Sequence, residues 1–394
     1  MKIFLRFLSW LTSGLCVIAI IYVFSERNFL IRYFSYNGDP LTNPISWFDP
    51  TEVINGSKND NLLVVSNDKF SISKSVLEEV SLYAESQSSL ALIIVHNGII
   101  QLEKYWDDAD RSVLFNPQSM SKSVLGILVG IAISEGYIDS VDDNIGKYIE
   151  EWRGDERGKI TIRQALQMSA GLEQMSSSYD LSIFNKAVRH HFGTSFDEMT
   201  LSLKQNDPPG TNYEYNNEET NLLGIVIERA TGNRYADYLS SRLWKPLELG
   251  DAKMYLDREN GSVMKSCCIL SRPYDWAKLG YLFIEKGLYN GKEIVATSWI
   301  NQMITPSVNK DFYGLQVWLG SSYIPSKSNN VGAYDKNENP PLYLDEEMLV
   351  FLGFGGQRTW VSSKYSLVIV YATKQWANSW IEAKIPNSII SSLQ

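Results

Sequence analysis

A serine followed three residues later by a lysine places a nucleophile beside a base, and this spacing occurs five times in the 394-residue chain. In such a pair the lysine amine removes the hydroxyl proton and the serine oxygen attacks an acyl carbon. The five serines are Ser66, Ser71, Ser119, Ser262 and Ser307. A motif this frequent identifies no site alone, so the surrounding sequence has to distinguish the pairs.

The pair that begins at Ser71 lies in SISKS, directly before an amphipathic stretch. Ser75 and Glu78 form a capping-box pattern, which predicts that a helix begins there. Apolar residues follow at helical spacing, namely Val76, Leu77, Val80 and Tyr83. The sequence therefore predicts a surface helix with Lys74 in water.

The pair that begins at Ser119 lies in SMSKS and is followed by VLGILVGIAI, ten residues without a charge. A helix that is apolar all round is buried, and the backbone N–H groups at its start favour a developing negative charge. Lys122 shares a helical face with Ser119, and burial should lower its pKa. The Ser71 pair offers no such burial, because its helix carries Glu78, Glu79 and Glu85.

Two later motifs can complete an acyl-transfer site. Tyr215-Asn216-Asn217 opens another apolar helix, where Tyr215 can relay a proton and Asn217 can hold a lysine or a substrate amide. The alternative is a helix cap with an exposed ring. GFGGQ, residues 353–357, lies between two strand-like runs, where glycines let a ligand approach the backbone and an N–H can bind an oxyanion. A bulge or tight turn is the alternative there.

The pattern of elements predicts one sheet built from both ends of the chain around a helical insertion. Asn97-Gly98 between two apolar runs predicts a hairpin, with His96 on the surface beside the turn. Residues 116–245 have mainly helical patterns, 274–287 and 297–304 add two helices, and GLQVWLG, RTWVSS and YSLVIVYAT return to strands. His190-His191 is interpreted as a solvated helix end, or as a substrate contact.

Composition excludes several classes of function. The net charge of −9 argues against a nucleic-acid partner. The three cysteines, Cys16 and the adjacent Cys267 and Cys268, do not form a disulfide framework or a metal cluster, and three histidines are too few for a zinc site.

The N-terminus predicts an exported protein. Residues 7–25 are 19 residues without a charge, preceded by Lys2 and Arg6. Such a helix nearly spans a hydrocarbon core of ~30 Å. We expect an uncleaved transmembrane anchor, with a cleaved signal peptide as the alternative, because bulky Tyr22, Val23 and Phe24 leave no small-residue cleavage site.

In this order the motifs resemble those of the serine β-lactamase and penicillin-binding-protein superfamily, which are Ser-x-x-Lys, Tyr-x-Asn and a Lys-Thr-Gly-type strand. The chain is most similar to the class C-like serine hydrolases, which include esterases, D-amino-acid peptidases and 6-aminohexanoate-dimer hydrolases. The resemblance extends over about residues 60–390 and includes PQSMSKS, LLGIVIERATG, the 274–300 stretch and YGLQVWLG.

The resemblance implies an α/β (α+β) fold of the β-lactamase/transpeptidase type. Its antiparallel sheet would be flanked by helices. The expected divisions are an anchor or signal segment at 1–25, a connector at 26–60 and a hydrolase domain at 61–394, with the helical subdomain at about 116–250.

By the same resemblance, Ser119 is the nucleophile, Lys122 the general base and Tyr215 the proton relay, while Asn217 orients Lys122 or the substrate. The oxyanion hole would use the backbone N–H groups of Ser119 and Phe354, next to Gly353 and Gly355. No metal and no cofactor is implied. Candidates for the pocket rim are Tyr179, Trp318, Trp360 and Trp376.

One departure from the superfamily pattern bears on the substrate. Its third motif normally has Lys or His two residues before the glycine, where the cation binds a substrate carboxylate, but here Phe351 and Leu352 precede Gly353. We therefore expect cleavage of an amide or ester in a small molecule or peptide. The alternatives are a β-lactamase or D,D-peptidase, and a catalytically silent sensor domain. The sequence makes no prediction of oligomeric state.

Overall fold

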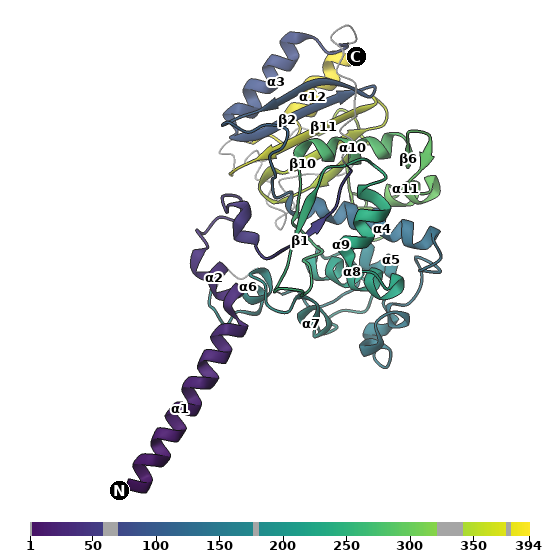
Figure 1. The fold of residues 1–394 in the computed structure, drawn as a ribbon. Coiled ribbons are helices and arrows are strands. Elements are labelled where there is room, and N and C mark those ends of the chain that lie inside the picture. Colours follow the sequence, from purple (N-terminus) through teal and green to yellow (C-terminus); the bar gives the residue numbers. More distant parts are fainter. Residues whose placement is uncertain (1, 58–69, 176–180, 321–341, 376–379) are drawn as a thin grey trace.

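A six-stranded antiparallel sheet forms the part of the molecule drawn uppermost in Figure 1. A computed structural model describes residues 2–57, 70–175, 181–320, 342–375 and 380–394. The strand order is β3-β2-β11-β10-β9-β8. The strands are β2 (Ser89–His96), β3 (Ile99–Tyr105), β8 (Trp318–Leu319), β9 (Leu349–Leu352), β10 (Arg358–Ser362) and β11 (Leu367–Thr373). Strands from both ends of the chain thus share one sheet, as predicted.

Helices cover both faces of this sheet. α3 (Lys74–Ser86) and α12 (Lys384–Leu393) lie on one face, and α10 (Pro273–Ile284) lies on the other (Figure 1). Within β2, Leu92 and Ile94 belong to the core under α3 and α12, whereas Ile93 and Val95 belong to the opposite core. Because both faces are buried, β2 has an almost continuous apolar sequence.

The structure confirms two local predictions and corrects one. Asn97 and Gly98, with φ of 51° and 72°, form the two-residue turn between β2 and β3. The serines of SISKS do begin an amphipathic helix. Its N-cap is Ser73 and not Ser75, because the Ser73 hydroxyl accepts from the Val76 N–H at 3.4 Å.

The helical subdomain lies beside the α10 face and is centred on two buried helices. α4 (Ser121–Ser134) is buried from Ser121 to Ala132, and α8 (Asn217–Thr231) packs against it. Its other α-helices are α5 (Ile162–Leu166), α6 (Lys186–His191), α7 (Phe196–Leu201) and α9 (Tyr235–Leu239), which continues as a π-helical turn (Ser240–Trp244). From further along the chain, α11 (Thr297–Met303) also packs against α4.

The N-terminal helix α1 (Lys2–Ser25) projects away from the domain (Figure 1). No described helix is by itself both long and apolar enough to cross a membrane. Trp10–Ser25 and Arg27–Ser35 together satisfy length and composition, although they are bent by 69° at their junction.

The segment expected to be a connector packs onto the domain. It contains α2 (Arg27–Ser35), a 3₁₀ turn (Ile45–Phe48) and β1 (Thr51–Ile54), which pairs with β4 (Ala252–Tyr255) and through it with β5 (Ile269–Leu270). The buried Arg32 guanidinium donates to the carbonyls of Asp49 and Leu256, each at 2.8 Å, and lies 4.3 Å from the Tyr255 ring. Residues 26–57 are therefore fixed to the domain.

Two glycines allow α11 to approach α4. A Cβ atom on Gly130 would lie 2.0 Å from Cδ1 of Trp299, whose Nε1 donates to the Gly126 carbonyl at 3.0 Å. We predict that Gly130→Ala lowers the free energy of unfolding by about 1–3 kcal/mol, because overpacking outweighs the gain in helix propensity. Urea denaturation measures this change.

Gly154→Ala is the matched control. No atom lies within 4 Å of a Cβ placed on Gly154, so its free energy of unfolding should stay within about 0.5 kcal/mol of the wild type. Equal stability of the two variants would show that the α4–α11 contact is not tightly packed.

Candidate active site

Ser119 lies in a sharp turn that leads into α4. The turn is a 3₁₀ segment (Gln118–Met120) directly before Ser121–Ser134. Gln118 has φ of +54°, in the left-handed region that non-glycine residues rarely adopt, and its N–H donates to the Asn116 side chain at 2.9 Å. This turn leaves Ser119 half-buried at the start of a buried helix.

Lys122 is almost fully buried and contacts three oxygen atoms. Its Nζ lies 2.8 Å from Asn217 Oδ1, 2.7 Å from the Ser266 carbonyl oxygen and 3.1 Å from Ser119 Oγ. The two carbonyl-type oxygens can only accept hydrogen bonds. A neutral amine has two N–H bonds to give them, so its lone pair is left for the Ser119 hydroxyl. This is the geometry that a base requires.

Burial also sets the protonation of this amine. It lowers the pKa of Lys122 to about 7, against the opposing effect of the nearby Glu218 carboxylate. Burial raises the pKa of Glu218 to about 7, an effect that Lys122 reduces. Near neutral pH a large share of Lys122 is therefore the free base.

Tyr215 and Asn217 flank the start of α8. The side chain of Asn216 caps this helix and accepts from the Glu218 N–H at 3.0 Å, so the cap and the site use neighbouring residues. The Tyr215 ring is half-buried, with its centroid 5.2 Å from Lys122 Nζ and 5.5 Å from the Trp318 ring. The helix-cap alternative was therefore right for Asn216, but the ring is not exposed.

The Tyr215 hydroxyl carries a proton that a leaving group can use. Burial raises the pKa of this phenol, and the neighbouring Ser119 hydroxyl lowers it. The buried oxygen completes no hydrogen bond with the described residues. A substrate atom bound there would satisfy it.

The GFGGQ turn lies against the turn that carries Ser119. A Cβ on Gly353 would be 2.2 Å from the Pro117 carbonyl oxygen, so only glycine allows this approach. Gly355 and Gly356, with φ of 78° and 102°, form a tight turn between β9 and β10. The Gly353 N–H donates within this turn, to Gln357 O at 2.8 Å. The tight-turn alternative is thus correct, and the turn lies beside Ser119.

A buried ion pair that the sequence analysis missed holds this turn. Arg358 and Glu382 are both fully buried and joined at 2.7 and 2.9 Å, and Arg358 also donates to the Gly353 carbonyl at 2.7 Å. Tyr343 and Trp380 donate to the same carboxylate. The partners are distant in sequence and their spacing follows no motif, so no local pattern marks them.

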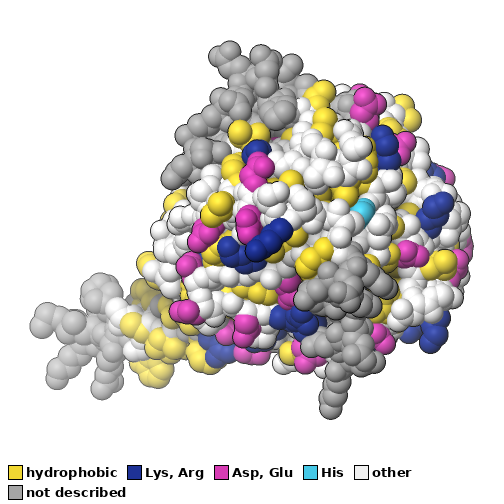
Figure 2. All heavy atoms as spheres, turned by 90° about the horizontal axis from the view of Figure 1, so that it is seen from above, with side chains coloured by type: hydrophobic (Ala, Val, Ile, Leu, Met, Phe, Trp, Pro, Cys, Tyr) yellow, Lys and Arg dark blue, Asp and Glu magenta, His cyan; other side chains and the backbone are white. Residues whose placement is uncertain are grey.

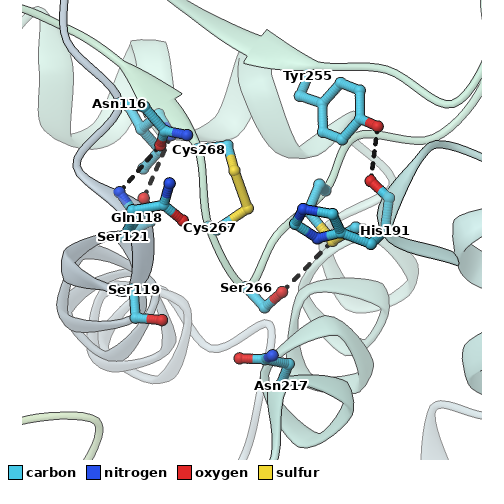
Figure 3. The surroundings of a disulfide bond; sticks show 12 residues. Asn116, Gln118, Ser119, Ser121, His191, Asn217, Tyr255, Ser266, Cys267 and Cys268 are labelled. Carbon is cyan, nitrogen blue, oxygen red and sulfur yellow. Dashed lines mark hydrogen bonds between the residues drawn. A yellow bond between two sulfur atoms is a disulfide. The ribbon is translucent and has the colours of Figure 1, made fainter. Parts of the chain in front are cut away.

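Two further features were missed, the Ser266 carbonyl beside Lys122 and the cysteine pair that follows Ser266 in the chain. The Ser266 acceptor is a backbone carbonyl, which leaves no side-chain signal. The adjacent Cys267 and Cys268 are joined by a disulfide (Figure 3), although the sequence showed no disulfide framework.

The remaining candidate residues divide between core and surface. Trp318 lies beside Tyr215, Trp360 is buried in the sheet core, and Tyr179 and Trp376 lie outside the described residues. His190 is buried, with Nδ1 3.9 Å from Glu218 Oε1, so the prediction of a solvated helix end was wrong for it and right only for His191.

In the Ser71 pair, the lysine is not placed to act as a base. Lys74 is 90% exposed and pairs with Glu78. Ser71 Oγ instead lies 2.5 Å from Nδ1 of His96, the last residue of β2.

The sequence profile of the Beta-lactamase family matches residues 81–385, and the chain belongs to this family. It is 27% identical over 210 residues to the 6-aminohexanoate-dimer hydrolase of Paenarthrobacter ureafaciens, covering 50% of this chain and 51% of the relative. Against protein flp of Staphylococcus aureus MRSA252 it is 27% identical over 173 residues, covering 40% and 33%. The chain thus spans about half or less of these curated relatives.

Solved structures show the same fold. A Bacillus anthracis protein assigned provisionally to the 6-aminohexanoate-dimer hydrolases superposes with a TM-score of 0.67 at 20% identity, covering 91% of both chains. EstCE1, described as a hydrolase with promiscuous acyltransferase activity, gives a TM-score of 0.61 at 14% identity, covering 81% of this chain and 97% of EstCE1. For a D-stereospecific amidohydrolase of Streptomyces, the TM-score is 0.55 at 16% identity, covering 81% and 98%.

The pKa of Lys122 predicts the acid limb of the pH–rate profile. Because the base must be neutral, kcat/KM should fall tenfold per pH unit below about 7. Glu218→Gln removes the negative charge that raises this pKa, so the limb should move to lower pH. Initial rates on a neutral ester between about pH 5 and 9 measure the shift.

The matched control is Glu214→Gln, since Glu214 is exposed just before Tyr215. Its acid limb should coincide with that of the wild type. A limb that stays fixed or moves to higher pH in Glu218→Gln would contradict the assignment of Lys122 as the base.

Proposed function

We propose that this chain is a serine hydrolase that cleaves an amide or ester of a small molecule or peptide through an acyl-enzyme on Ser119. One observation carries the proposal. The amine of Lys122 directs both N–H bonds to carbonyl-type oxygens and lies 3.1 Å from Ser119 Oγ, so a neutral amine has its lone pair available there. Family membership supports the same chemistry.

In the acylation step, Lys122 takes the Ser119 proton as Oγ attacks the acyl carbon. Negative charge then develops on the acyl oxygen, where the backbone N–H groups of Ser119 and Phe354 would stabilise it. The Tyr215 proton passes to the leaving group as the scissile bond breaks, and Lys122 reprotonates the phenol. In deacylation, water attacks the ester on Ser119 while Tyr215 takes one proton from the water and passes its own proton to Lys122. Lys122 returns this proton to Ser119 Oγ as the acid leaves.

The third motif indicates which substrates fit. Phe351 and Leu352 are each 1% exposed and belong to the core, so neither presents a charge to a ligand. Relatives named as a 6-aminohexanoate-dimer hydrolase and a D-stereospecific amidohydrolase support amide cleavage, and EstCE1 supports a broader hydrolase activity. A substrate without an obligatory carboxylate beside the acyl group is the best fit, and β-lactams are disfavoured.

Active-site labelling tests this function in the full chain in detergent. A fluorophosphonate should label the wild type and Ser71→Ala, and should fail to label Ser119→Ala. Ester turnover by Ser119→Ala should fall at least ~10³-fold. A fluorescent penicillin should label the protein only weakly.

The other outcomes separate the alternatives. Strong Ser119-dependent penicillin labelling would support a β-lactamase or D,D-peptidase instead. Absence of Ser119-dependent labelling by either probe would indicate a catalytically silent domain. If Ser71→Ala lost labelling while Ser119→Ala kept it, Ser71 and not Ser119 would be the nucleophile.

We also propose that α1 anchors an exported catalytic domain in a membrane. Its described side chains include the exposed apolar residues Trp10, Ile20 and Phe24. On the face shown in Figure 2, basic and acidic side chains are interspersed and form no continuous basic surface, so the described residues visible there do not favour binding of a nucleic acid.

With α1 as a membrane anchor, the full chain should resist alkaline carbonate extraction from membranes. Release of the intact chain would contradict the anchor, and release of a shortened chain would indicate a cleaved signal.

A further inference from the structure

The adjacent cysteines lie in a short segment that passes over the catalytic lysine. We define residues 265–271 as the cysteine segment. In Figure 3 its Ser266 lies between the turn that carries Ser119 and the helix that carries Asn217. The Ser266 carbonyl is one of the two acceptors that take the N–H bonds of Lys122. The orientation of this one peptide group therefore affects where the amine lone pair points.

The N-terminal side of the cysteine segment is fixed to α8. Asn221 Oδ1 accepts from the N–H groups of Lys265 and Ser266 at 3.1 and 2.8 Å. The buried Lys265 amine pairs with Asp197 at 2.7 Å and with Glu228 at 3.0 Å. These bonds fix the peptide group that carries the Ser266 N–H. The Ser266 carbonyl belongs to the next peptide group, so its orientation depends on the residues that follow.

The C-terminal side is fixed to α4 and to the strand-like segment before it. The Ile269 N–H donates to Ser121 Oγ at 3.2 Å, and Ser271 forms an antiparallel bridge with Phe115. Cys267 and Cys268 lie between these two attachments. They are joined to each other, with Cα atoms 3.7 Å apart. The disulfide ring thus restrains the backbone between the two attachments, which includes the peptide group of the Ser266 carbonyl.

Cys268 also has an unusual backbone conformation. Its φ of +73° lies in the left-handed region that L-residues seldom adopt without a constraint. Cys268 is also buried, with 2% of its surface exposed. The disulfide to the neighbouring residue supplies that constraint. Once the ring is opened, Cys268 is free to relax to negative φ, and the peptide groups before it turn with it.

We propose that the Cys267–Cys268 disulfide is a positioning element of the active site, which holds the Ser266 carbonyl against Lys122 Nζ. Opening the disulfide releases this acceptor and misdirects the amine lone pair. This inference rests on the proposed hydrolase function. It also makes the activity dependent on an oxidising environment, in which such a bond persists.

Reduction of the purified full chain is the experiment. In a Cys16→Ser background the only cysteines left are the adjacent pair, so a thiol titration reports its state directly. A water-soluble trialkylphosphine attacks one sulfur and breaks the S–S bond. Water then gives its oxygen to the phosphine oxide and its protons to the two thiols. Ester turnover is measured before and after reduction, and again after reoxidation with oxidised glutathione.

We expect kcat to fall about tenfold with KM unchanged, because misplacing a catalytic group by about an ångström costs up to ~100-fold in rate. The acid limb of the pH–rate profile should move to lower pH, since a lost carbonyl acceptor favours the neutral amine. Reoxidation should restore both quantities. Cys267→Ser/Cys268→Ser should have the kinetics of the reduced enzyme and no response to the phosphine.

Several results would overturn the proposal. Unchanged kcat with two titratable thiols would show that the ring positions nothing, and free thiols before reduction would show that no disulfide is present. A loss of activity that parallels loss of folded protein by circular dichroism, with the acid limb unmoved, would make the pair purely structural. If the oxidised protein had no Ser119-dependent turnover, the proposed function itself would fail.

Discussion

The arrangement of the site depends on the burial of one amine. Lys122 is 1% exposed in a helix with no other charged residue along its length, and two fixed oxygens take its hydrogen bonds. Removing the amine from water lowers its pKa to about 7, and the acceptors give its lone pair a direction. Both effects are needed, because a neutral amine that points elsewhere is as inactive as a protonated one.

Three separate parts of the chain supply these constraints. The 3₁₀ turn and α4 that follows it carry the serine and the lysine, α8 supplies Asn217, and the cysteine segment supplies the Ser266 carbonyl. A fourth part, the GFGGQ turn, is brought against Pro117 by the sheet and is held by the buried Arg358–Glu382 pair. Each of these groups therefore depends on tertiary packing for its position, which the close-packed core around α4 fixes.

Periodicity and turn chemistry were enough to predict most of the fold. The uncharged run after Ser119 identified the buried helix, Asn97-Gly98 identified the hairpin, and apolar runs at both ends identified strands of one sheet. In the structure, Ser119 Oγ and Asn217 Oδ1 both lie within hydrogen-bonding distance of Lys122 Nζ. Local patterns could not reveal Ser266, because its contribution is a main-chain oxygen, nor Glu382, because its partner is on another element. The same limit applied to the cysteines, whose adjacency offered no framework to recognise.

The division of the sheet between the two ends of the chain affects when the enzyme can be completed during synthesis. The ribosome releases β2, β3 and the helical subdomain first, so Ser119, Lys122 and Asn217 can assemble while the rest of the chain is still being made. β11, which pairs with β2 on the side away from β3, emerges last together with the Arg358–Glu382 pair that holds the glycine turn. A nascent or truncated chain would therefore hold Ser119 and Lys122 without the glycine turn beside them, which delays the complete site until translation is nearly finished.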